Sequence, residues 1–223
     1  MPADRPSLTL QGIRKRWPGA DHPVLNDVSL TIDPGTAIHL SGSNGVGKTT
    51  LLRIASGLIR PEAGSVRFGE LDIEADRTSF HRRIGFLAAA STGLYARLTV
   101  RDHLRFWSRV ALMDRADRGP ACARVLDAFA LHGFADRRVD RLSMGQRQRL
   151  RLAGAVVHDP WVVMLDEPMT SLDEEGIELL AVEIERFRHA GRAVVLCAPS
   201  GESEGPIRFD RRLALREDRL VST

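Results

Sequence analysis

The sequence contains very little cysteine, lysine and glutamine, and it has no long run of apolar residues. Its two cysteines, Cys122 and Cys197, form neither a CxxC pair nor a metal-binding spacing, so neither a disulfide framework nor a zinc site is expected. A membrane-spanning helix needs about 20 apolar residues, and stretches such as 161–165 are far shorter. The first residues also lack the apolar region of a signal peptide. These absences predict a cytosolic protein, or one held at the cytosolic face of a membrane.

The remaining composition is that of a folded domain. Hydrophobic residues make up 43% of the 223 positions and charged residues 27%, which allows a buried core and excludes general disorder. The 32 basic and 29 acidic residues leave a net charge of only +3, so the charge balance requires no nucleic-acid partner. The length fits one α/β domain.

A glycine-rich loop stands between a short apolar strand and a buried helix. Its pattern, Gly42-x-x-x-x-Gly47-Lys48-Thr49, is a complete P-loop, whose glycines let backbone N–H groups curl toward phosphate oxygens. Lys48 is expected to reach the β- and γ-phosphates, and Thr49 to bind Mg²⁺. Only two of the basic residues are lysines, and the one retained here supplies a compact ammonium that fits between phosphates. The predicted nucleotide-binding residues of the loop are Gly42, Ser43, Asn44, Gly45, Val46, Gly47, Lys48, Thr49 and Thr50.

A second apolar stretch, residues 162–165, predicts a strand buried on both faces and ends in two carboxylates. The tip of such a strand lies beside the P-loop in an open α/β sheet. Asp166 is expected to hold Mg²⁺, and Glu167 to orient or deprotonate an attacking water. We therefore predict Glu167 and Lys48 as the catalytic residues, with Thr49 and Asp166 at the metal.

The segment from Leu142 to Gln146 opens a predicted helix that runs to Val157. Ser143 is a natural N-cap, and Gly145 allows a phosphate to approach closely. Alone, this pattern is more typical of an ordinary capped helix. It gains weight because Gln146 precedes Asp166 by twenty residues and a P-loop lies upstream.

Together these motifs resemble the ATP-binding subunit of ATP-binding-cassette (ABC) transporters over nearly the whole chain. The resemblance makes 42–49 the Walker A motif and 162–167 the Walker B motif, and it is strongest to single-cassette exporters of the haem-exporter and ABC-2 types. It also makes Trp17 the aromatic residue that stacks on adenine, against the alternative of a surface aromatic in a turn. The signature motif would be Ser143, Met144, Gly145 and Gln146, which departs from LSGGQ only at Met144, and the D-loop would be Ser171, Leu172 and Asp173.

The resemblance implies an α/β fold with a P-loop NTPase core on a mixed sheet. It adds an N-terminal antiparallel β-subdomain and an inserted α-helical subdomain. We expect a single ABC ATPase domain over residues 1–223. In this division, 1–90 and 156–223 form the β-subdomain and nucleotide-binding core, and 91–155 form the helical subdomain with the signature motif.

The resemblance also implies that two cassettes, identical or paralogous, close head to tail around two ATP molecules and Mg²⁺. The signature of one chain then binds the γ-phosphate held by the other chain's P-loop. Hydrolysis moves a membrane-spanning subunit, so the chain would be peripheral at the cytoplasmic face of the inner or plasma membrane. No direct nucleic-acid contact is expected. Leu94, Tyr95 and Leu98 are expected to line the groove for the membrane subunit, against the alternative of ordinary packing.

Two positions depart from the family pattern. Ala89 stands where the family has a glutamine, and no glutamine occurs between Gln11 and Gln146. Pro199 stands where the family has a switch histidine, and no histidine follows His189. Removing a side chain that stabilises the transferring group typically costs about 10²–10³-fold in rate. We therefore expect ATP binding with weak intrinsic hydrolysis.

Two other functions remain open from the sequence. A regulatory, poorly hydrolysing cassette would pair with an active paralogue. A non-transport ABC ATPase acting on nucleic acid or ribosomes would usually carry two cassettes or a long coiled-coil insertion, and the sequence has neither. The cargo is chosen by membrane subunits in this family, so this sequence does not identify it.

Overall fold

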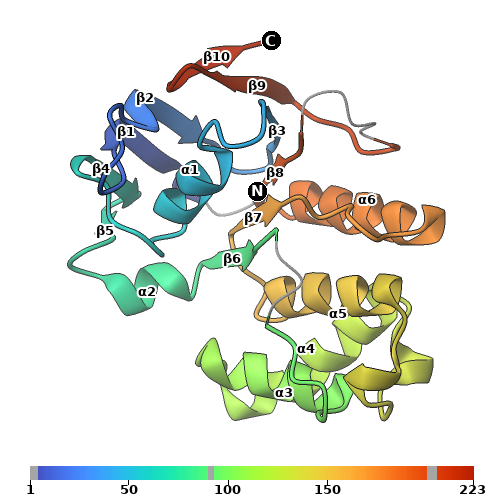
Figure 1. The fold of residues 1–223 in the computed structure, drawn as a ribbon. Helices are drawn as coiled ribbons and strands as arrows, with labels where there is room; N and C mark the ends of the chain where they lie inside the picture. The colour runs from blue at the N-terminus through green and yellow to red at the C-terminus, as the bar shows by residue number, and fades with distance from the viewer. Residues whose placement is uncertain (1–4, 90–92, 200–204) are drawn as a thin grey trace.

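The computed structural model describes residues 5–89, 93–199 and 205–223, which form two β-sheets flanked by helices (Figure 1). The smaller sheet is antiparallel with the order β2-β1-β4-β5. Its strands are β1 (Leu8–Lys15), β2 (Leu25–Ile32), β4 (Ala63–Phe68) and β5 (Leu71–Asp72). This is the antiparallel N-terminal sheet that the resemblance implied.

The larger sheet has the order β10-β9-β3-β8-β7-β6. Its strands β9, β3, β8, β7 and β6 pair in parallel, and β10 pairs antiparallel at one edge. The sheet is therefore mixed, as predicted. The strands are β3 (Ala37–Ser41), β6 (Ile84–Leu87), β7 (Val162–Asp166), β8 (Ala193–Cys197), β9 (Arg211–Arg216) and β10 (Arg219–Ser222).

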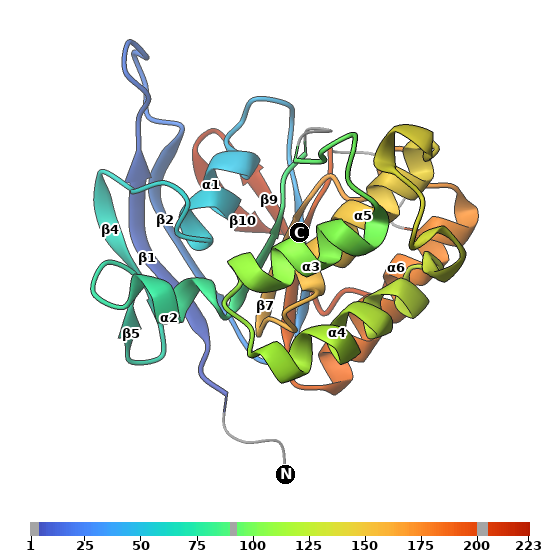
Figure 2. The same cartoon turned by 90° about the horizontal axis from the view of Figure 1, so that it is seen from below.

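Helices α3, α4 and α5 come from one continuous part of the chain and lie together below the sheets in Figure 1 and in front of the larger sheet in Figure 2. The helices are α1 (Lys48–Ala55), α2 (Arg77–His81), α3 (Val100–Val110), α4 (Arg115–Ala128), α5 (Met144–Val156) and α6 (Glu174–His189), with short 3₁₀ turns at His132–Phe134 and Val139–Arg141. Among the described residues, none of these helices has the length and apolar character needed to cross a membrane.

The central strand β7 is buried on both faces, as its apolar sequence predicted. Val162 and Met164 belong to the core shared with α1 and the smaller sheet, whereas Val163 and Leu165 belong to the core shared with α4, α5 and α6. This alternation follows from the two-residue period of a strand. The tip of β7 is thereby held rigidly between two hydrophobic cores.

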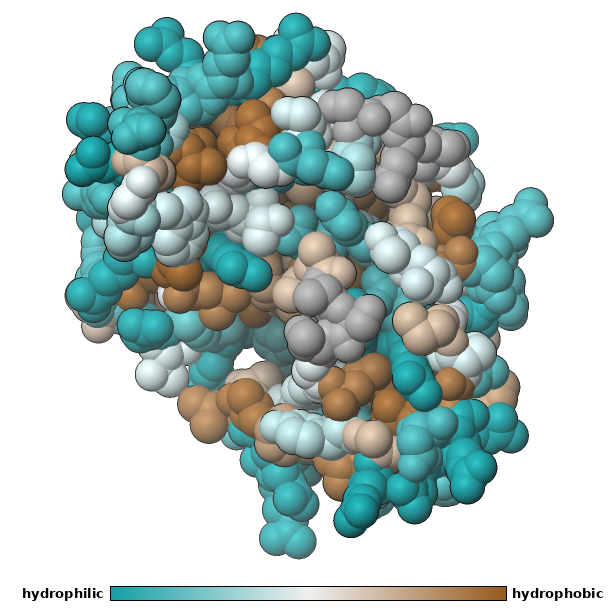
Figure 3. Space-filling view, viewed as in Figure 1, coloured by the Kyte–Doolittle hydropathy of each residue, from teal (hydrophilic) through white to brown (hydrophobic). Residues whose placement is uncertain are grey.

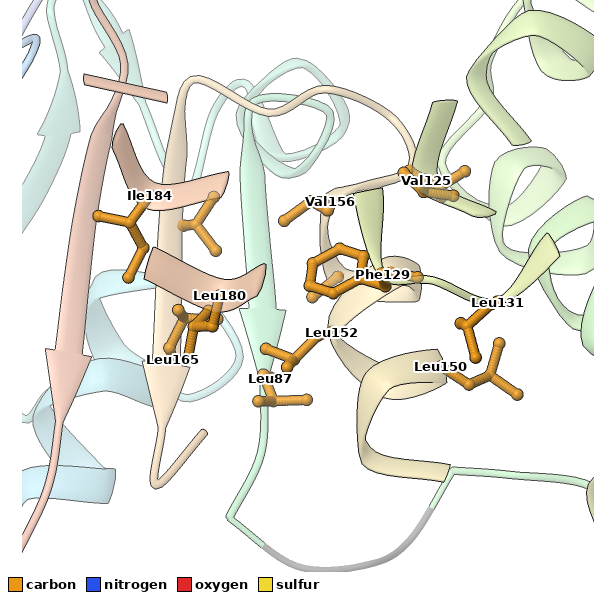
Figure 4. Packing of buried hydrophobic residues seen from close by; sticks show 14 of the residues in the cluster. Leu87, Val125, Phe129, Leu131, Leu150, Leu152, Val156, Leu165, Leu180 and Ile184 are labelled. Carbon is orange, nitrogen blue, oxygen red and sulfur yellow. The ribbon is translucent and has the colours of Figure 1, made fainter. Parts of the chain in front are cut away.

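The second core attaches the helical part to the sheet. Figure 4 shows Phe129, at the end of α4, surrounded by side chains from α5 and facing residues of β6, β7 and α6. Phe129 is 1% exposed, and its neighbours Leu152 and Leu87 are similarly buried. Helix α5, which carries the predicted signature motif, is therefore packed in the same core as β6 and β7, and β7 ends at Asp166.

Two helix starts follow their capping signals. Thr99 caps α3 by accepting a hydrogen bond from the Asp102 N–H at 3.1 Å, and Ser143 begins α5 with a reciprocal capping box to Gln146. The buried helix predicted after the P-loop spans Lys48–Ala55. It ends there because the nearby Gly57 has a φ of 72°, a left-handed conformation that stops a helix. The five-residue helix α2 is too short to show a sequence period, and it was not predicted.

Candidate functional site

Four loops of the chain meet at one edge of the larger sheet. Strands β3, β8, β7 and β6 are neighbours and run parallel, so their carboxyl ends lie side by side. The P-loop follows β3, Pro199 lies beyond β8, Asp166 and Glu167 end β7, and Ala89 lies beyond β6. Residues that are far apart in sequence therefore form one continuous edge.

The P-loop adopts a conformation that requires its glycines. Gly42 and Gly47 have φ angles of 150° and 115°, which side chains rarely tolerate. A Cβ added at Gly42 would lie 2.7 Å from the Leu215 carbonyl oxygen, and one at Gly47 would lie 2.8 Å from the Val24 carbonyl oxygen. Both positions thus lack room for a side chain, and Gly47 is the N-cap of α1.

The Lys48 side chain lies within the curve of this loop. It is 6% exposed, and its Nζ donates hydrogen bonds to the carbonyl oxygens of Gly42 at 2.7 Å and Ser43 at 3.0 Å. The first turn of α1 adds N–H groups without intrahelical partners. An ammonium group and free N–H donors are therefore gathered at the start of one helix, which is the arrangement that binds phosphate.

Thr49 and Asp166 are joined across the edge of the sheet. The Thr49 hydroxyl donates to Asp166 Oδ2 at 2.8 Å, and the Asp166 side chain is almost fully buried. The other oxygen, Oδ1, has no hydrogen-bond partner among the described residues. A buried carboxylate with an unpaired oxygen, next to a hydroxyl, fits a hard cation such as Mg²⁺.

No cluster of three or more His, Cys, Asp or Glu side chains that could hold a metal occurs in the described ranges. A cation at Thr49 and Asp166 would therefore take its remaining ligands from water and from nucleotide phosphates, as Mg²⁺ usually does.

Glu167 follows Asp166 in a strained backbone conformation. Its φ is 51°, in the left-handed region that non-glycine residues seldom occupy, and its N–H donates to the Cys197 carbonyl oxygen at 2.9 Å. The Cys197 side chain is itself buried beside Asp166, and burial together with the carboxylate charge raises the pKa of this thiol. The thiol therefore stays protonated at neutral pH.

Ala89 and Pro199 lie on opposite sides of Glu167. Strand β7 is between β6 and β8, so the positions that follow these two strands flank the end of β7. A methyl group and a pyrrolidine ring offer no side-chain hydrogen bond to a water or a phosphate. The two departures seen in the sequence thus fall on either side of the predicted general base.

The signature residues lie next to the D-loop. Ser143 Oγ accepts from the Gln146 N–H at 3.2 Å, and Gln146 Oε1 accepts from the Ser143 N–H at 3.1 Å. Met144 is 54% exposed. A Cβ added at Gly145 would lie 3.2 Å from the Ser171 carbonyl oxygen, so the two motifs are adjacent.

Arg149 holds the same two motifs together. Its Nη2 donates to Asp173 Oδ1 at 2.6 Å and to Glu175 Oε2 at 2.8 Å. Asp173 also caps α6 through the Gly176 N–H at 3.0 Å. The hydrogen bonds from Arg149 and then Gly176 lower the pKa of Asp173. Arg149 was not singled out from the sequence, because only the fold shows that α5 runs beside the start of α6.

A second set of contacts connects α5 to the segments that follow β6 and β7 at this edge of the larger sheet. Arg151 donates to the Ala88 carbonyl oxygen at 2.5 Å and to Gln148 Oε1 at 2.6 Å, and Gln148 Nε2 donates to the Pro168 carbonyl oxygen at 2.8 Å. The ends of β6 and β7 are thus tied to the signature helix. The available sequence signal was the i, i+3 spacing of Gln148 and Arg151 on one helix face.

Four further residues were predicted from the sequence as site residues, namely Trp17, Leu94, Tyr95 and Leu98. Trp17, in the β1–β2 connection, is 42% exposed, with the Lys15 ammonium 5.2 Å from its ring centroid. Leu94 lines a cavity of about 250 Å³ together with Ala89 and Met144. Tyr95 is 58% exposed and meets Phe106 edge to face, and the Leu98 carbonyl accepts a hydrogen bond from the Val139 N–H at 3.0 Å. Their roles stay predictions.

Comparison with known proteins gives a consistent family. Residues 25–170 match the family profile described as "ABC transporter". The chain is 41% identical over 174 residues to the cytochrome c biogenesis ATP-binding export protein CcmA of Roseobacter denitrificans, covering 78% of this chain and 76% of the relative. It is 31% identical to the ABC transporter ATP-binding protein NatA of Bacillus subtilis over 171 residues, covering 77% and 70%.

A longer alignment joins the chain to CcmA of Escherichia coli K12, with 32% identity over 203 residues, 90% of this chain and 93% of the relative. Among solved structures, one titled "Structure of ATP binding subunit of ABC transporter" superposes with a TM-score of 0.85. It covers 96% of this chain and 89% of its own at 22% identity, so it shows the shared fold.

Proposed function

Because the chain belongs to the ABC transporter family, as an ATP-binding and ATP-hydrolysing subunit, we propose that it is one of two cassettes that close around ATP and move a separate membrane-spanning subunit. Family membership confirms the resemblance seen in the sequence motifs. The observation that carries the proposal is the common edge of the larger sheet, where Lys48, Thr49, Asp166 and Glu167 meet.

Each residue at this edge has a separate role in ATP binding and hydrolysis. The P-loop N–H groups and the Lys48 ammonium hold the β- and γ-phosphates. Thr49 and Asp166 would hold Mg²⁺, which when bound neutralises charge on the phosphate oxygens. Glu167 orients the attacking water and accepts its proton. Trp17 stacks on the adenine from the β1–β2 connection.

The second half of each site comes from another cassette. Support for this comes from the adjacency of the signature and the D-loop, held by Arg149, and from the exposure of Met144 at the start of α5. In this arrangement Ser143, Gly145 and the first turn of α5 bind the γ-phosphate held by the partner's P-loop. The bridge through Arg151 and Gln148 then connects this contact to the chain's own catalytic edge.

The hydrolysis step is slow in this proposal because neither Ala89 nor Pro199 offers a side-chain hydrogen bond that could help Glu167 to hold the attacking water. A cassette of this kind acts mainly by ATP-driven closure. A regulatory function is consistent with this proposal if the chain pairs with a paralogue that hydrolyses ATP. We take 91–155 as the helical subdomain that carries the signature, within one cassette over residues 1–223.

Replacing Lys48 by alanine is expected to weaken ATP binding. A charge-assisted hydrogen bond contributes about 1.5–3 kcal/mol, so the dissociation constant should rise roughly 10- to 100-fold. Calorimetry with ATP measures this change, and a thermal melt checks folding. Arg53→Ala, which removes an exposed cation from the same helix, is the matched control and should leave affinity unchanged. Unaltered affinity in Lys48→Ala would refute nucleotide binding at the P-loop.

An exposed apolar strip supports a membrane-subunit contact. The α3 apolar surface, which we define as Tyr95, Phe106, Val110 and Leu112, has exposed fractions between 40% and 63%. It borders a cavity of about 440 Å³ between α2, β6, α3 and α5. Figure 3 shows the surface hollowed between the sheets and the helical part, with apolar side chains on both sides. Such a patch is typical of a protein interface.

Val110→Glu is expected to weaken the complex with the membrane subunit by about tenfold or more, because a charge would be buried in an apolar contact. Co-expression with a membrane-spanning protein encoded beside this chain, followed by purification, measures the complex. Val182→Glu places the same charge at a similarly exposed valine on α6 and should have no effect. Equal capture of both variants would remove the α3 apolar surface from the interface.

Export is the direction we propose, since two of the relatives are named as ATP-binding export proteins. The chain would then be peripheral at the cytoplasmic face of the membrane that holds its partner. We do not propose direct nucleic-acid binding at this site, because the cation that the site offers is Lys48 in the P-loop, which is assigned to the nucleotide.

A further inference from the structure

A strongly basic cavity lies between α3 and α4, away from the nucleotide edge. Its volume is about 460 Å³, within the range of small-molecule sites, and no aspartate or glutamate lines it. We call it the basic cavity; its polar lining residues are Arg101, Arg105, Arg109, Arg115, Arg118 and His132. Figure 2 shows the two helices side by side on the face of the helical part that is turned away from the sheet.

The cavity concentrates positive charge, although the chain as a whole is close to neutral. Five arginines give it a formal charge of +5, whereas the whole chain carries only +3. Arg101, Arg105 and Arg109 follow one another at four-residue intervals, so they share one face of α3. Like charges at this spacing repel, which destabilises the helix unless an anion lies among them.

The described residues neutralise this charge only in part. Arg101 makes a bidentate pair with Asp136 at 2.8 and 3.2 Å, and Arg105 reaches Asp102 at no closer than 4.0 Å. Arg109 and Arg115 also line the cavity and are exposed, and within the described ranges neither side chain has an ion-pair or hydrogen-bond partner. At least two guanidinium groups in this concave site are therefore available to a ligand.

We propose that the basic cavity binds a phosphate-bearing anion. Guanidinium groups match phosphate oxygens in paired hydrogen bonds. The floor, formed by the buried side chains of Cys122 and Leu126, offers a small apolar surface to the carbon part of a ligand. The same chemistry has two sources, an acidic lipid headgroup and a soluble polyphosphate.

The inference that the ligand is a lipid headgroup rests on the proposed function, in which the chain binds a membrane subunit. Phe106 and Val110 of the α3 apolar surface are on the same helix as the arginines, one position further along from Arg105 and Arg109. If that surface meets a membrane subunit, the basic stripe beside it is brought toward the bilayer. A helix with adjacent basic and apolar stripes is the kind that binds anionic membrane surfaces.

The test compares two charge-matched triple variants of the full chain. One changes Arg105, Arg109 and Arg115 to glutamine, and the control changes the exposed Arg53, Arg216 and Arg219 to glutamine. The first probe is vesicles of phosphatidylcholine with phosphatidylglycerol, against pure phosphatidylcholine, by co-sedimentation. The second is tripolyphosphate, by calorimetry, with the P-loop saturated by ADP.

Each basic residue near an anionic surface contributes about 1 kcal/mol, or about fivefold in affinity, so the cavity variant, which loses three, should bind acidic vesicles about 100-fold more weakly. The control should change by about threefold at most. Vesicle binding without tripolyphosphate binding identifies a headgroup ligand, and the reverse identifies a soluble one; either supports the proposal. Equal losses in both variants, or no binding of either probe, overturn it.

ATP affinity measured on the same samples separates this proposal from the proposed function. The cavity variant should retain wild-type ATP affinity, because its substitutions lie outside the nucleotide edge. If the cavity variant loses anion binding but keeps its ATP affinity, the result supports the basic cavity and does not bear on the nucleotide site. If Lys48→Ala leaves ATP affinity unchanged, the result contradicts the nucleotide site and does not bear on the cavity.

Discussion

Glu167→Gln is expected to lower ATP hydrolysis by about 10²–10⁴-fold while leaving ATP binding intact. A positioned general base contributes about this factor, and an amide cannot accept the proton of the attacking water. The Cys197 thiol beside it cannot replace it, because burial raises the pKa of that group. Phosphate release under single-turnover conditions measures the rate, and calorimetry measures binding.

Under the proposed function, in which hydrolysis separates the cassettes, the variant should also prolong the closed pair. Size-exclusion chromatography with ATP should then show a dimer that lasts longer than that of the wild type. Glu178→Gln removes an exposed carboxylate on α6 and serves as the control. A Glu167→Gln protein that hydrolyses ATP at the wild-type rate would show that another residue activates the water.

Restoring the two absent side chains is expected to raise turnover. The double variant Ala89→Gln and Pro199→His places an amide and an imidazole on either side of Glu167, where hydrogen bonds can orient the water and the γ-phosphate. Each such contact is typically worth about 10²–10³-fold in rate, and we expect the pair together to gain at least about 10²-fold. Steady-state ATPase assays with the purified variant measure kcat and KM separately.

The controls change each side chain without adding a side-chain amide or imidazole. Ala89→Met supplies a side chain of similar length to glutamine, and Pro199→Ala removes the ring without adding an imidazole; neither should raise kcat. Adding Glu167→Gln to the double variant should abolish the gain. Wild-type turnover already in the ordinary range, about 1–10³ per second, or no gain in the double variant, would contradict slow hydrolysis through these two positions.

The two experiments also separate the forms of the proposed function. Weak hydrolysis that rises only when a paralogous cassette is added favours the regulatory form, in which one chain supplies closure and the other turnover. Hydrolysis that depends on Glu167 and rises with a membrane subunit favours a transporter built from two copies of this chain. In both forms ATP binds at the same edge of the larger sheet. The forms differ in whether the partner cassette supplies the glutamine and histidine that this chain lacks.

Much of the nucleotide site was predictable because its signals are local. The P-loop depends on glycines and one lysine within eight residues. The structure confirms that glycine is needed at Gly42 and Gly47, because both have positive φ angles. The buried character of β7 and the cap at Ser143 were also predictable, since periodicity and capping act over one or two turns. The absences at Ala89 and Pro199 followed from the family resemblance, and the positions of the glutamines and histidines in the sequence supported them.

Other features depended on contacts between distant segments. Arg149, Gln148 and Arg151 look like ordinary helix residues, and only the packing of α5 against β6, β7 and α6 gives them partners. The basic cavity likewise requires α3 and α4 to lie side by side. Neither arrangement leaves a local pattern, because each joins residues from different elements.

By itself, the sequence determined the family, the phosphate-binding loop, the paired carboxylates and the two missing polar side chains, since all of these are short-range patterns of residue type. The tertiary structure alone decided that Ala89 and Pro199 flank Glu167 and that the signature touches the D-loop. Strand order brings these loops to one edge, and strand order is set by the packing of two hydrophobic cores on opposite faces of the sheet.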